Sequence, residues 1–246
     1  MAEIQVIPVS SLPAIQPGDR LGCLIARSAV SLVPGDVVVV AQKVVSKAEN
    51  RLVRLDSVSP GSFAVEVGRF LGRDARLAEI ILRETKRIVK MDRGILITET
   101  RHGLVCANAG VDLSNVDGGT TASLLPLDPD ASAFRISAEL AESVGWMPPV
   151  IITDTFGRPW REGLVEVAIG LFGVKALRDY RGREDPQGLK LAATVIADVD
   201  QLASAAGLVF RKDSGIPACL IRGYEPAGEA GSARDLIRPP ERDLFR

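Results

Sequence analysis

The stretch Pro34-Gly35-Asp36-Val37-Val38-Val39-Val40-Ala41 decides the fold class of this chain. Its first three residues are a turn signal, and the residues after them form an uninterrupted apolar run. β-Branched residues favour strands, and a strand that is apolar on both sides needs cover on both faces of its sheet. The stretch therefore predicts a central strand over residues 37–41, in an α/β protein whose sheet is layered by helices.

Further elements are predicted on both sides of this strand. Apolar residues at helical spacing, with charges between them, predict a surface helix over residues 77–89. Arg101-His102-Gly103 is a turn-length connection between two apolar runs, which predicts a hairpin. A helix should begin at Asp128-Pro129-Asp130 and end at Gly145. The hairpin strands are expected over 95–100 and 104–108, other strands over 150–153, 167–174 and 217–222, and a helix over 198–206. This order indicates mixed sheets with covering helices.

Composition narrows the class of protein. A chain of 246 residues fits one large or two small domains, and at this length roughly 70% of the unfolded surface can be buried. Its 30 Lys and Arg balance 31 Asp and Glu, so no overall field favours nucleic acid or an anionic membrane. No uncharged apolar stretch reaches roughly 18 residues, which predicts a soluble protein. Cys23, Cys106 and Cys219 are interpreted as buried free thiols, which favours a reducing, cytoplasmic setting.

Several familiar catalytic motifs are absent from the sequence. There is no G-x-x-x-x-G-K-[ST] and no G-x-G-x-x-G after a strand, so a nucleotide must be held in another way. His102 is the single histidine and falls in the expected hairpin turn, and no G-x-S-x-G occurs, which argues against a Ser-His-Asp hydrolase. Cysteine and histidine do not cluster at ligand spacing, so zinc is not expected.

Two segments each deliver one aspartate from an apolar extended run into a polar, glycine-containing turn. They are Asn108-Ala109-Gly110-Val111-Asp112-Leu113-Ser114-Asn115-Val116 and Pro149-Val150-Ile151-Ile152-Thr153-Asp154-Thr155-Phe156-Gly157-Arg158-Pro159-Trp160-Arg161. Turns at strand ends commonly carry reactive groups. Their oxygen donors suit magnesium or manganese, which keep waters and share phosphate oxygens, so a metal-nucleotide is the expected ligand. The alternative is that both aspartates cap turns through backbone amides.

Three other segments each have a functional and a structural interpretation. Lys43 and Lys47 share one face if their segment is helical, where they could hold phosphates or simply face solvent. Leu12-Pro13-Ala14-Ile15 is a stiff apolar loop that could pack on a base or form the edge of the core. Arg158 and Arg161 could bind a carboxylate or phosphate, or pair at the surface with Glu162 and Glu166.

Taken together, six blocks resemble the coenzyme F420-0:L-glutamate ligases (γ-glutamyl ligases), in matching order from about residue 6 to about residue 223. The blocks are Leu12-Pro13-Ala14-Ile15, the segment from Gln42 to Glu49, Cys106-Ala107-Asn108-Ala109-Gly110-Val111-Asp112-Leu113-Ser114-Asn115-Val116, Leu125-Pro126-Leu127-Asp128-Pro129-Asp130, Ile151-Ile152-Thr153-Asp154-Thr155-Phe156-Gly157-Arg158 and Asp213-Ser214-Gly215-Ile216-Pro217.

This resemblance implies a GTP-dependent enzyme that joins L-glutamate to F420-0 and can extend the tail through γ-linkages. It implies two divalent ions, Mg2+ or Mn2+, help from a monovalent ion such as K+, and an intertwined homodimer of the unusual γ-glutamyl ligase fold. No nucleic acid or membrane partner is expected. Residues 1–223 are expected to form the ligase module, in one body or two lobes. Residues 224–246 are polar and contain proline and glycine, so a loosely held C-terminal extension is expected there.

The resemblance also implies roles for individual residues. Asp112 and Asp154 are expected to bind the divalent ions, with a further oxygen from Thr155, and Lys47 should meet phosphate as a point charge. Asn115 and the Gln42-Lys43 pair should contact the nucleotide, and Leu12 to Ile15 should wall its base or sugar. Arg158 and Arg161 are candidate substrate residues. A loop should close over the nucleotide, formed by Leu208, Val209, Phe210, Arg211, Lys212, Asp213 and Ser214.

The chain departs from the family pattern at two places. Phe210-Arg211-Lys212-Asp213 stands where the family commonly has a glycine and an acid, so Asp213 could replace that acid or the two cations could act toward phosphate. Gln42 stands where smaller hydroxyl residues are frequent. Three functions therefore remain open: the glutamate ligase, a ligase of the same chemistry acting on another acid or amino acid, and a noncatalytic module that binds a metal-nucleotide or deazaflavin.

Overall fold

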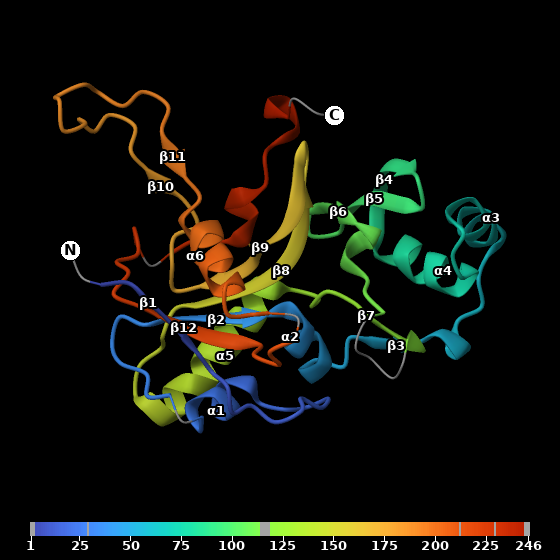
Figure 1. The fold of residues 1–246 in the computed structure, drawn as a ribbon, viewed down its shortest axis with the longest axis horizontal. Coiled ribbons are helices and arrows are strands. Elements are labelled where there is room, and N and C mark those ends of the chain that lie inside the picture. Colours follow the sequence, from blue (N-terminus) through green and yellow to red (C-terminus); the bar gives the residue numbers. More distant parts are fainter. Residues whose placement is uncertain (1–2, 29, 114–118, 212, 229, 244–246) are drawn as a thin grey trace.

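A mixed five-stranded sheet forms the centre of the computed structural model, which describes residues 3–28, 30–113, 119–211, 213–228 and 230–243. Its strand order is β1-β12-β2-β8-β9 (Figure 1). β2 and β8 are parallel and the other neighbours are antiparallel. The strands are β1 (Gln5–Pro8), β12 (Ala218–Arg222), β2 (Val37–Ala41), β8 (Val150–Arg158) and β9 (Arg161–Phe172).

Helices cover both faces of this sheet. Val38 and Val40 pack in one core with α1 (Leu21–Ala26) and α5 (Pro129–Val144). Val37 and Val39 pack in a second core with α6 (Asp198–Gly207) on the opposite face. All four valines are 0% exposed, so the central strand predicted over residues 37–41 is confirmed, together with the layered α/β architecture.

A third core lies beside the central sheet, in the green and teal part of Figure 1. Its apolar residues come from two helices and from two small antiparallel sheets, β3-β7 and β4-β5-β6. The elements are α3 (Ser62–Leu71), α4 (Ala75–Glu84), β3 (Leu52–Arg54), β7 (Thr121–Ser123), β4 (Thr85–Asp92), β5 (Ile95–Thr100) and β6 (Val105–Ala107). This lobe therefore carries the segment that leads to Asp112.

The helix predicted over residues 77–89 ends earlier than expected. α4 stops at Glu84, and the chain continues directly as β4, paired with β5. Thr85 marks the change, because its hydroxyl donates to the carbonyl of Ile81 at 2.7 Å. Ile88 is β-branched and pairs with Thr98 of β5, so strand pairing overrides the helical spacing that the sequence shows over these residues.

β8 and β9 are longer than the strands predicted over 150–153 and 167–174. They form one hairpin, paired from Val150 with Phe172 to Arg158 with Arg161. Asp154 and Thr155 therefore lie within a strand, not in a turn as the sequence suggested. β8 continues to pair with β9 after β2 has ended. This outer part of β8 contains polar residues, because it is not covered by core residues on both faces.

Other predicted elements are confirmed with small shifts of their ends. β5 and β6 form the expected hairpin, although β6 ends at Ala107. The Asp128 side chain accepts from the amide of Ala131 at 3.0 Å and caps α5, which ends at Gly145 as expected. α6 and β12 also lie where the sequence placed them. Among the described residues, no helix is long and apolar enough to cross a membrane.

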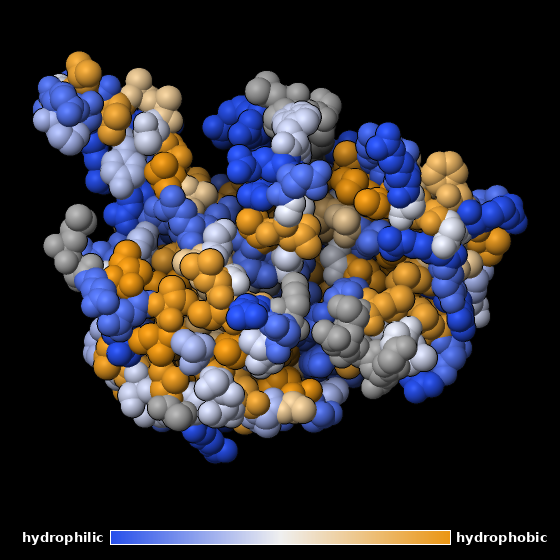
Figure 2. All heavy atoms as spheres, viewed as in Figure 1, coloured by the Kyte–Doolittle hydropathy of each residue, from blue (hydrophilic) through white to orange (hydrophobic). Residues whose placement is uncertain are grey.

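Two features project from or wrap this body. β10 (Arg178–Asp179) and β11 (Val195–Ile196) form the base of an arm that stands clear of the surface (Figure 2). The C-terminal segment contains short helices at Ala233–Leu236 and Pro240–Arg242. Ser232 donates to the Asp130 carboxylate at 2.6 Å, and Ala233 is buried, so this part of the C-terminal segment packs on the start of α5.

Candidate functional site

The turn that leads to Asp112 has an unusual backbone. Asn108, Ala109 and Gly110 are all left-handed, with φ of 53°, 53° and 70°. A buried alanine in this conformation stores strain, which structures tend to keep at functional sites. Gly110 has no room for a side chain, because an added Cβ would lie 2.7 Å from Cγ of the buried Leu125. The turn is followed by mutual backbone hydrogen bonds between Asp112 and Ser123, which fix the position of the aspartate.

α2 (Gln42–Ala48) begins directly after β2 and supplies the partner of Asp112. The Lys43 ammonium group lies 2.6 Å from the Asp112 carboxylate. Lys47 follows one turn later on the same helix, half-buried, and the described part of the chain offers its ammonium group no ion-pair partner. Gln42 is buried and accepts from the Ser46 hydroxyl at 2.8 Å. The predicted helical face with two lysines is therefore confirmed.

Asp154 lies at the same end of β2. Ala41, the last residue of β2, pairs with Thr153, so Asp154 is the first residue of β8 beyond that strand. Cys106 gives a second link between Asp154 and the Asp112 segment. Burial, with a further contribution from the Asp154 charge, raises the pKa of Cys106 to about 12. The structure thus brings β8, the start of α2 and the strand before the Asp112 turn together near the carboxyl end of β2.

Thr155 belongs to the opposite face of β8 from Asp154. Successive side chains of a strand alternate between faces. Thr153 and Thr155 both donate to the buried carboxylate of Glu166, at 2.9 and 2.6 Å. The three predicted metal ligands are therefore divided between the two faces of β8. The sequence suggested Glu166 only as a surface partner of arginine, although an acid between Val165 and Val167 in an apolar strand was a usable signal.

The loop predicted to close over the nucleotide continues from α6. Phe210 is buried in the second core and Val209 packs against it, so these two side chains anchor the loop. Leu208 is exposed, Arg211 lies 3.3 Å from Asp213, and Ser214 donates to the Arg211 carbonyl at 2.8 Å. Lys212 lies outside the described residues, as do Ser114 and Asn115.

The apolar loop near the N-terminus forms part of the edge of the first core. Ile15 is buried in the first core and Leu12 packs against that core, as the core-edge alternative required. Pro13 and Ala14 are exposed and remain available to a ligand.

Arg158 and Arg161 lie at the tip of the β8–β9 hairpin. They form its last pair, and Arg158 donates to the Glu162 carbonyl at 3.1 Å. Four residues separate Arg158 from Asp154, which at about 3.3 Å per residue is on the order of 13 Å along the strand. The surface ion pair considered for Glu166 does not form, because that carboxylate accepts from threonines.

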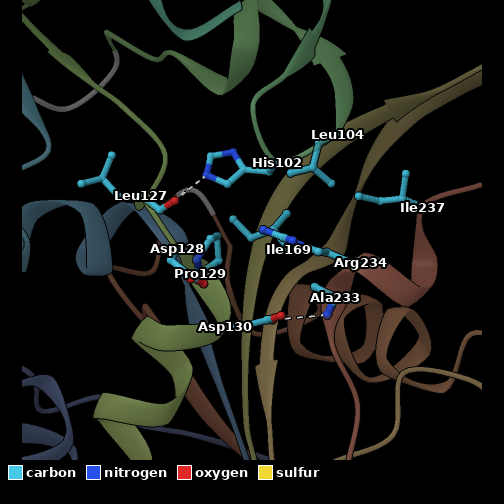
Figure 3. A pocket seen from close by; sticks show the side chains of 10 residues that line it. All are labelled: His102, Leu104, Leu127, Asp128, Pro129, Asp130, Ile169, Ala233, Arg234 and Ile237. Atoms are coloured by element: carbon cyan, nitrogen blue, oxygen red, sulfur yellow. Dashed lines mark hydrogen bonds between the residues drawn. The ribbon is translucent and has the colours of Figure 1, made fainter. Parts of the chain in front are cut away.

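A small cavity, which neither Asp112 nor Asp154 lines, lies between the β5–β6 turn, the start of α5 and the C-terminal segment (Figure 3). Its volume is about 50 Å³, which holds one or two waters, whereas small-molecule sites reach roughly 300 Å³ or more. His102 lines it and its Nε2 lies 3.1 Å from the Leu127 carbonyl oxygen, which confirms His102 as a turn residue. This cavity cannot take a nucleotide.

The donor groups near the end of β2 fit a metal that arrives with a nucleotide. Among the described residues, no three His, Cys, Asp or Glu side chains are grouped so that they could hold a metal ion. Magnesium is usually bound by one or two carboxylates together with waters and substrate phosphates, not by a cage made only of protein groups. Asp112 and Asp154 match that kind of incomplete ligand set, whereas the Thr155 side chain lies on the other face of β8. The buried Asn108 Oδ1 nearby also has no hydrogen-bond partner among these residues.

Comparison with known proteins decides the family. Residues 10–223 match the profile of the family described as F420-0:Gamma-glutamyl ligase. The chain belongs to this family. It is 48% identical over 248 residues to the protein named coenzyme F420:L-glutamate ligase of Methanopyrus kandleri, covering 99% of this chain and 98% of that relative. Proteins of the same name from Methanothermobacter thermautotrophicus and Methanocaldococcus jannaschii are 42% and 40% identical, over 99% of this chain and 99% and 97% of theirs. The family resemblance seen in the sequence blocks is therefore confirmed.

Proposed function

We propose that this chain is a GTP-dependent ligase that joins L-glutamate to coenzyme F420-0 and can extend the product through γ-glutamyl linkages. The observation that supports the proposal is that the Lys43–Asp112 ion pair and Asp154 lie at the same end of β2. The names of the relatives support glutamate and F420 as substrates. The choice of GTP and of metal ions rests on the family resemblance and on the donor groups present.

The chemistry of amide formation explains why these groups are needed. A carboxylate has a poor leaving group, so its oxygen first receives the γ-phosphoryl group of GTP, giving an acyl phosphate and releasing GDP. The glutamate amine attacks that carbonyl carbon, the C–N bond forms, the nitrogen loses a proton, and phosphate leaves with the C–O electron pair. Two divalent ions, Mg2+ or Mn2+, would neutralise the phosphate charge when bound, with K+ as a further cation.

The chain's own residues hold and orient the reactants in this proposal. Asp112 and Asp154 bind the divalent ions, and Lys43 orients the Asp112 carboxylate through its 2.6 Å contact. Lys47 meets phosphate as a compact positive charge. Gln42 and Asn115 contact the nucleotide. The exposed Pro13 and Ala14 wall its base or sugar, and the loop over residues 208–214 closes above it.

The reaction itself is tested by mass spectrometry. Purified protein with GTP, Mn2+, L-glutamate and F420-0 is expected to convert F420-0 to a product that is heavier by one or more glutamyl units. A panel of other acids and amino acids, run with and without divalent ions, separates the glutamate ligase from a related ligase. The absence of any product across the panel, with GTP still bound, would favour a noncatalytic binding module.

We also propose that the β8–β9 hairpin docks on a second copy of the chain in an intertwined homodimer. Trp160 and Leu164 are 81% and 65% exposed on this hairpin, an unusual display of apolar surface near one tip. In such a dimer, Arg158 and Arg161 would reach the substrate of the partner. A tip that extends beyond the core of its own chain is consistent with this role.

Trp160→Ser is expected to weaken the dimer at least about tenfold, because buried tryptophan is a common interface anchor. Light scattering during size-exclusion chromatography across a dilution series measures this shift toward monomer. Leu189→Ser is the matched control, since Leu189 is 68% exposed but lies on the arm between β10 and β11. If both variants dissociate at the same dilution as the unmodified chain, the hairpin is not the dimer contact.

A further inference from the structure

The lobe around the third core is a single insertion in the chain. α2 comes before it and α5 comes after it, and both helices pack in the first core. The lobe begins with β3 and ends with β7, and these strands pair antiparallel, with Leu52 opposite Ser123 (Figure 1). The chain therefore enters and leaves the lobe at neighbouring points, residues 49–52 and 123–126, which we call the crossings. Short segments of this kind are where the orientation of a lobe is set.

Arg51 joins the two crossings. Its backbone amide donates to the Ser46 carbonyl of α2 at 2.8 Å, and its carbonyl accepts from the Leu124 amide at 2.9 Å. In the side chain, Nε donates to the Leu125 carbonyl at 2.9 Å, and Nη2 donates to the Glu84 carboxylate at 2.9 Å. Arg51 therefore connects the end of α2, the exit from the lobe and the last residue of α4.

The Arg51–Glu84 ion pair is largely shielded from solvent. The two side chains are 17% and 18% exposed, whereas Arg83, which pairs with Glu79 along α4, is 56% exposed. A partly buried pair is screened less than an exposed one, and the planar guanidinium group donates in fixed directions. The Arg51 side chain therefore fixes how α4 is oriented relative to the crossings.

The division between this lobe and the rest of the chain runs through the candidate site. Asp112 belongs to the lobe, whereas Lys43 and Asp154 belong to α2 and β8 of the central body. Asp112 is also close to the crossings, because it exchanges backbone hydrogen bonds with Ser123, the last residue of β7. A rotation of the lobe at the crossings would therefore move Asp112 relative to Lys43 and Asp154.

We propose that Arg51 is a positioning residue for the ligase reaction, which fixes the orientation of the lobe and so the distance from Asp112 to Lys43 and Asp154. This inference rests on the proposed function, in which Asp112 and Asp154 bind the divalent ions. Arg51 acts through Asp112 and not on a reactant. Without its guanidinium group the lobe stays attached but its orientation varies, and a misplacement of about 1 Å can lower a rate about 100-fold.

Arg51→Met in the full-length chain is the main kinetic test, because methionine keeps much of the stem and removes the guanidinium group. The kcat of glutamyl transfer is expected to fall about 100-fold, with a much smaller change in the KM for glutamate. Arg51→Lys should recover part of this loss, since its ammonium group can still reach one of the two acceptors. If Arg51→Met does not fold, Glu84→Gln takes its place, because it removes the ion pair and leaves the bond to Leu125.

Arg83→Met is the matched control. The substitution is the same and the ion pair has the same length of 2.9 Å, but Arg83 and Glu79 lie on one helix and do not link the lobe to the crossings. This variant should keep the full kcat. A full kcat in Arg51→Met would overturn the proposal, and so would an equal loss of kcat in Arg83→Met.

The orientation of the lobe is measured directly by pulsed electron paramagnetic resonance, without metal or nucleotide. Spin labels at Glu66→Cys of α3 and Glu142→Cys of α5 report the distance between the lobe and the body, and both positions are exposed. Labelled chain is diluted with unlabelled chain, so that distances within one chain are read. Arg51→Met is expected to shift or broaden the distance distribution, and Arg83→Met to leave it unchanged.

The native cysteines do not interfere with this measurement. Cys23, which is half-buried, is replaced by serine in every variant. Cys106 and Cys219 are buried, and burial raises the pKa of both thiols to about 12, so they do not react with the label.

The two measurements separate this inference from the proposed function. An unchanged distance distribution in Arg51→Met would overturn the inference. If the unmodified chain forms product and Arg51→Met forms it at the full rate, the inference fails and the ligase function stands. If the unmodified chain forms no product but the distance changes in Arg51→Met alone, the lobe orientation depends on Arg51 and only the ligase function fails.

Discussion

Asp154→Asn is expected to reduce glutamate-dependent GTP consumption by about 10²- to 10³-fold or more, while the chain stays folded. The substitution removes the charge that a divalent ion needs and changes the volume of the side chain very little. Asn also keeps an oxygen that can accept from the Thr155 amide, as Asp154 does at 2.9 Å. The rate is measured by phosphate release with and without glutamate, and folding by thermal melting.

Asp92→Asn is a suitable control, because Asp92 is an exposed acid at the end of β4, in the lobe away from β8. It should keep the full rate. Turnover by Asp154→Asn at the rate of the unmodified chain would show that Asp154 does not bind an essential metal, and the site proposed at the end of β2 would have to be abandoned.

Gly22→Ala is expected to destabilise the chain by about 1–3 kcal/mol. An alanine Cβ at this position of α1 would lie 2.4 Å from the Ile136 carbonyl oxygen and 2.5 Å from Glu139 Cβ, both on α5. The Gly22 amide also donates to the Glu139 carboxylate at 2.8 Å, which a shift of the helix would lengthen. Thermal unfolding should show a fall of roughly 2–4 °C for each kcal/mol lost.

The sign of this effect is diagnostic. Helix propensity alone predicts that Gly→Ala inside a helix stabilises by up to about 1 kcal/mol. Gly157→Ala is the comparison, because its Cβ would meet only Leu164 Cδ2, at an ordinary 3.7 Å. This control should melt close to the unmodified chain. A Gly22→Ala chain that melts as high as the control would mean that α1 and α5 are not as closely packed as described.

Local signals in the sequence predicted local structure well. The valine run at residues 37–40 is apolar on both sides, and only a strand between two helical layers satisfies it. Asp128 and Gly145 cap α5 through contacts with residues a few positions away. The errors at the end of α4 and along β8 have a common cause. In both, pairing with the next strand of a hairpin decided the conformation of residues whose local pattern favoured something else.

The sequence also allowed part of the candidate site to be proposed. Asp112 and Asp154 stand out because acids rarely follow long apolar runs, and the family resemblance located them together. The buried setting of Glu166 could not be predicted in this way, because its hydrogen bonds come from two threonines across the hairpin. The division of Asp154 and Thr155 between two faces also becomes visible only when the turn predicted there proves to be a strand.

The left-handed turn before Asp112 limits how this protein can evolve. Position 110 admits only glycine, since both its φ of 70° and the neighbouring Leu125 exclude a methyl group. At position 109, burial leaves little room for anything larger than the alanine present. Random drift can therefore rewrite the surface of such a chain much faster than this tripeptide. A search for remote descendants of the same ancestor should weight Asn108-Ala109-Gly110 and the aspartate two residues later above the rest of the sequence.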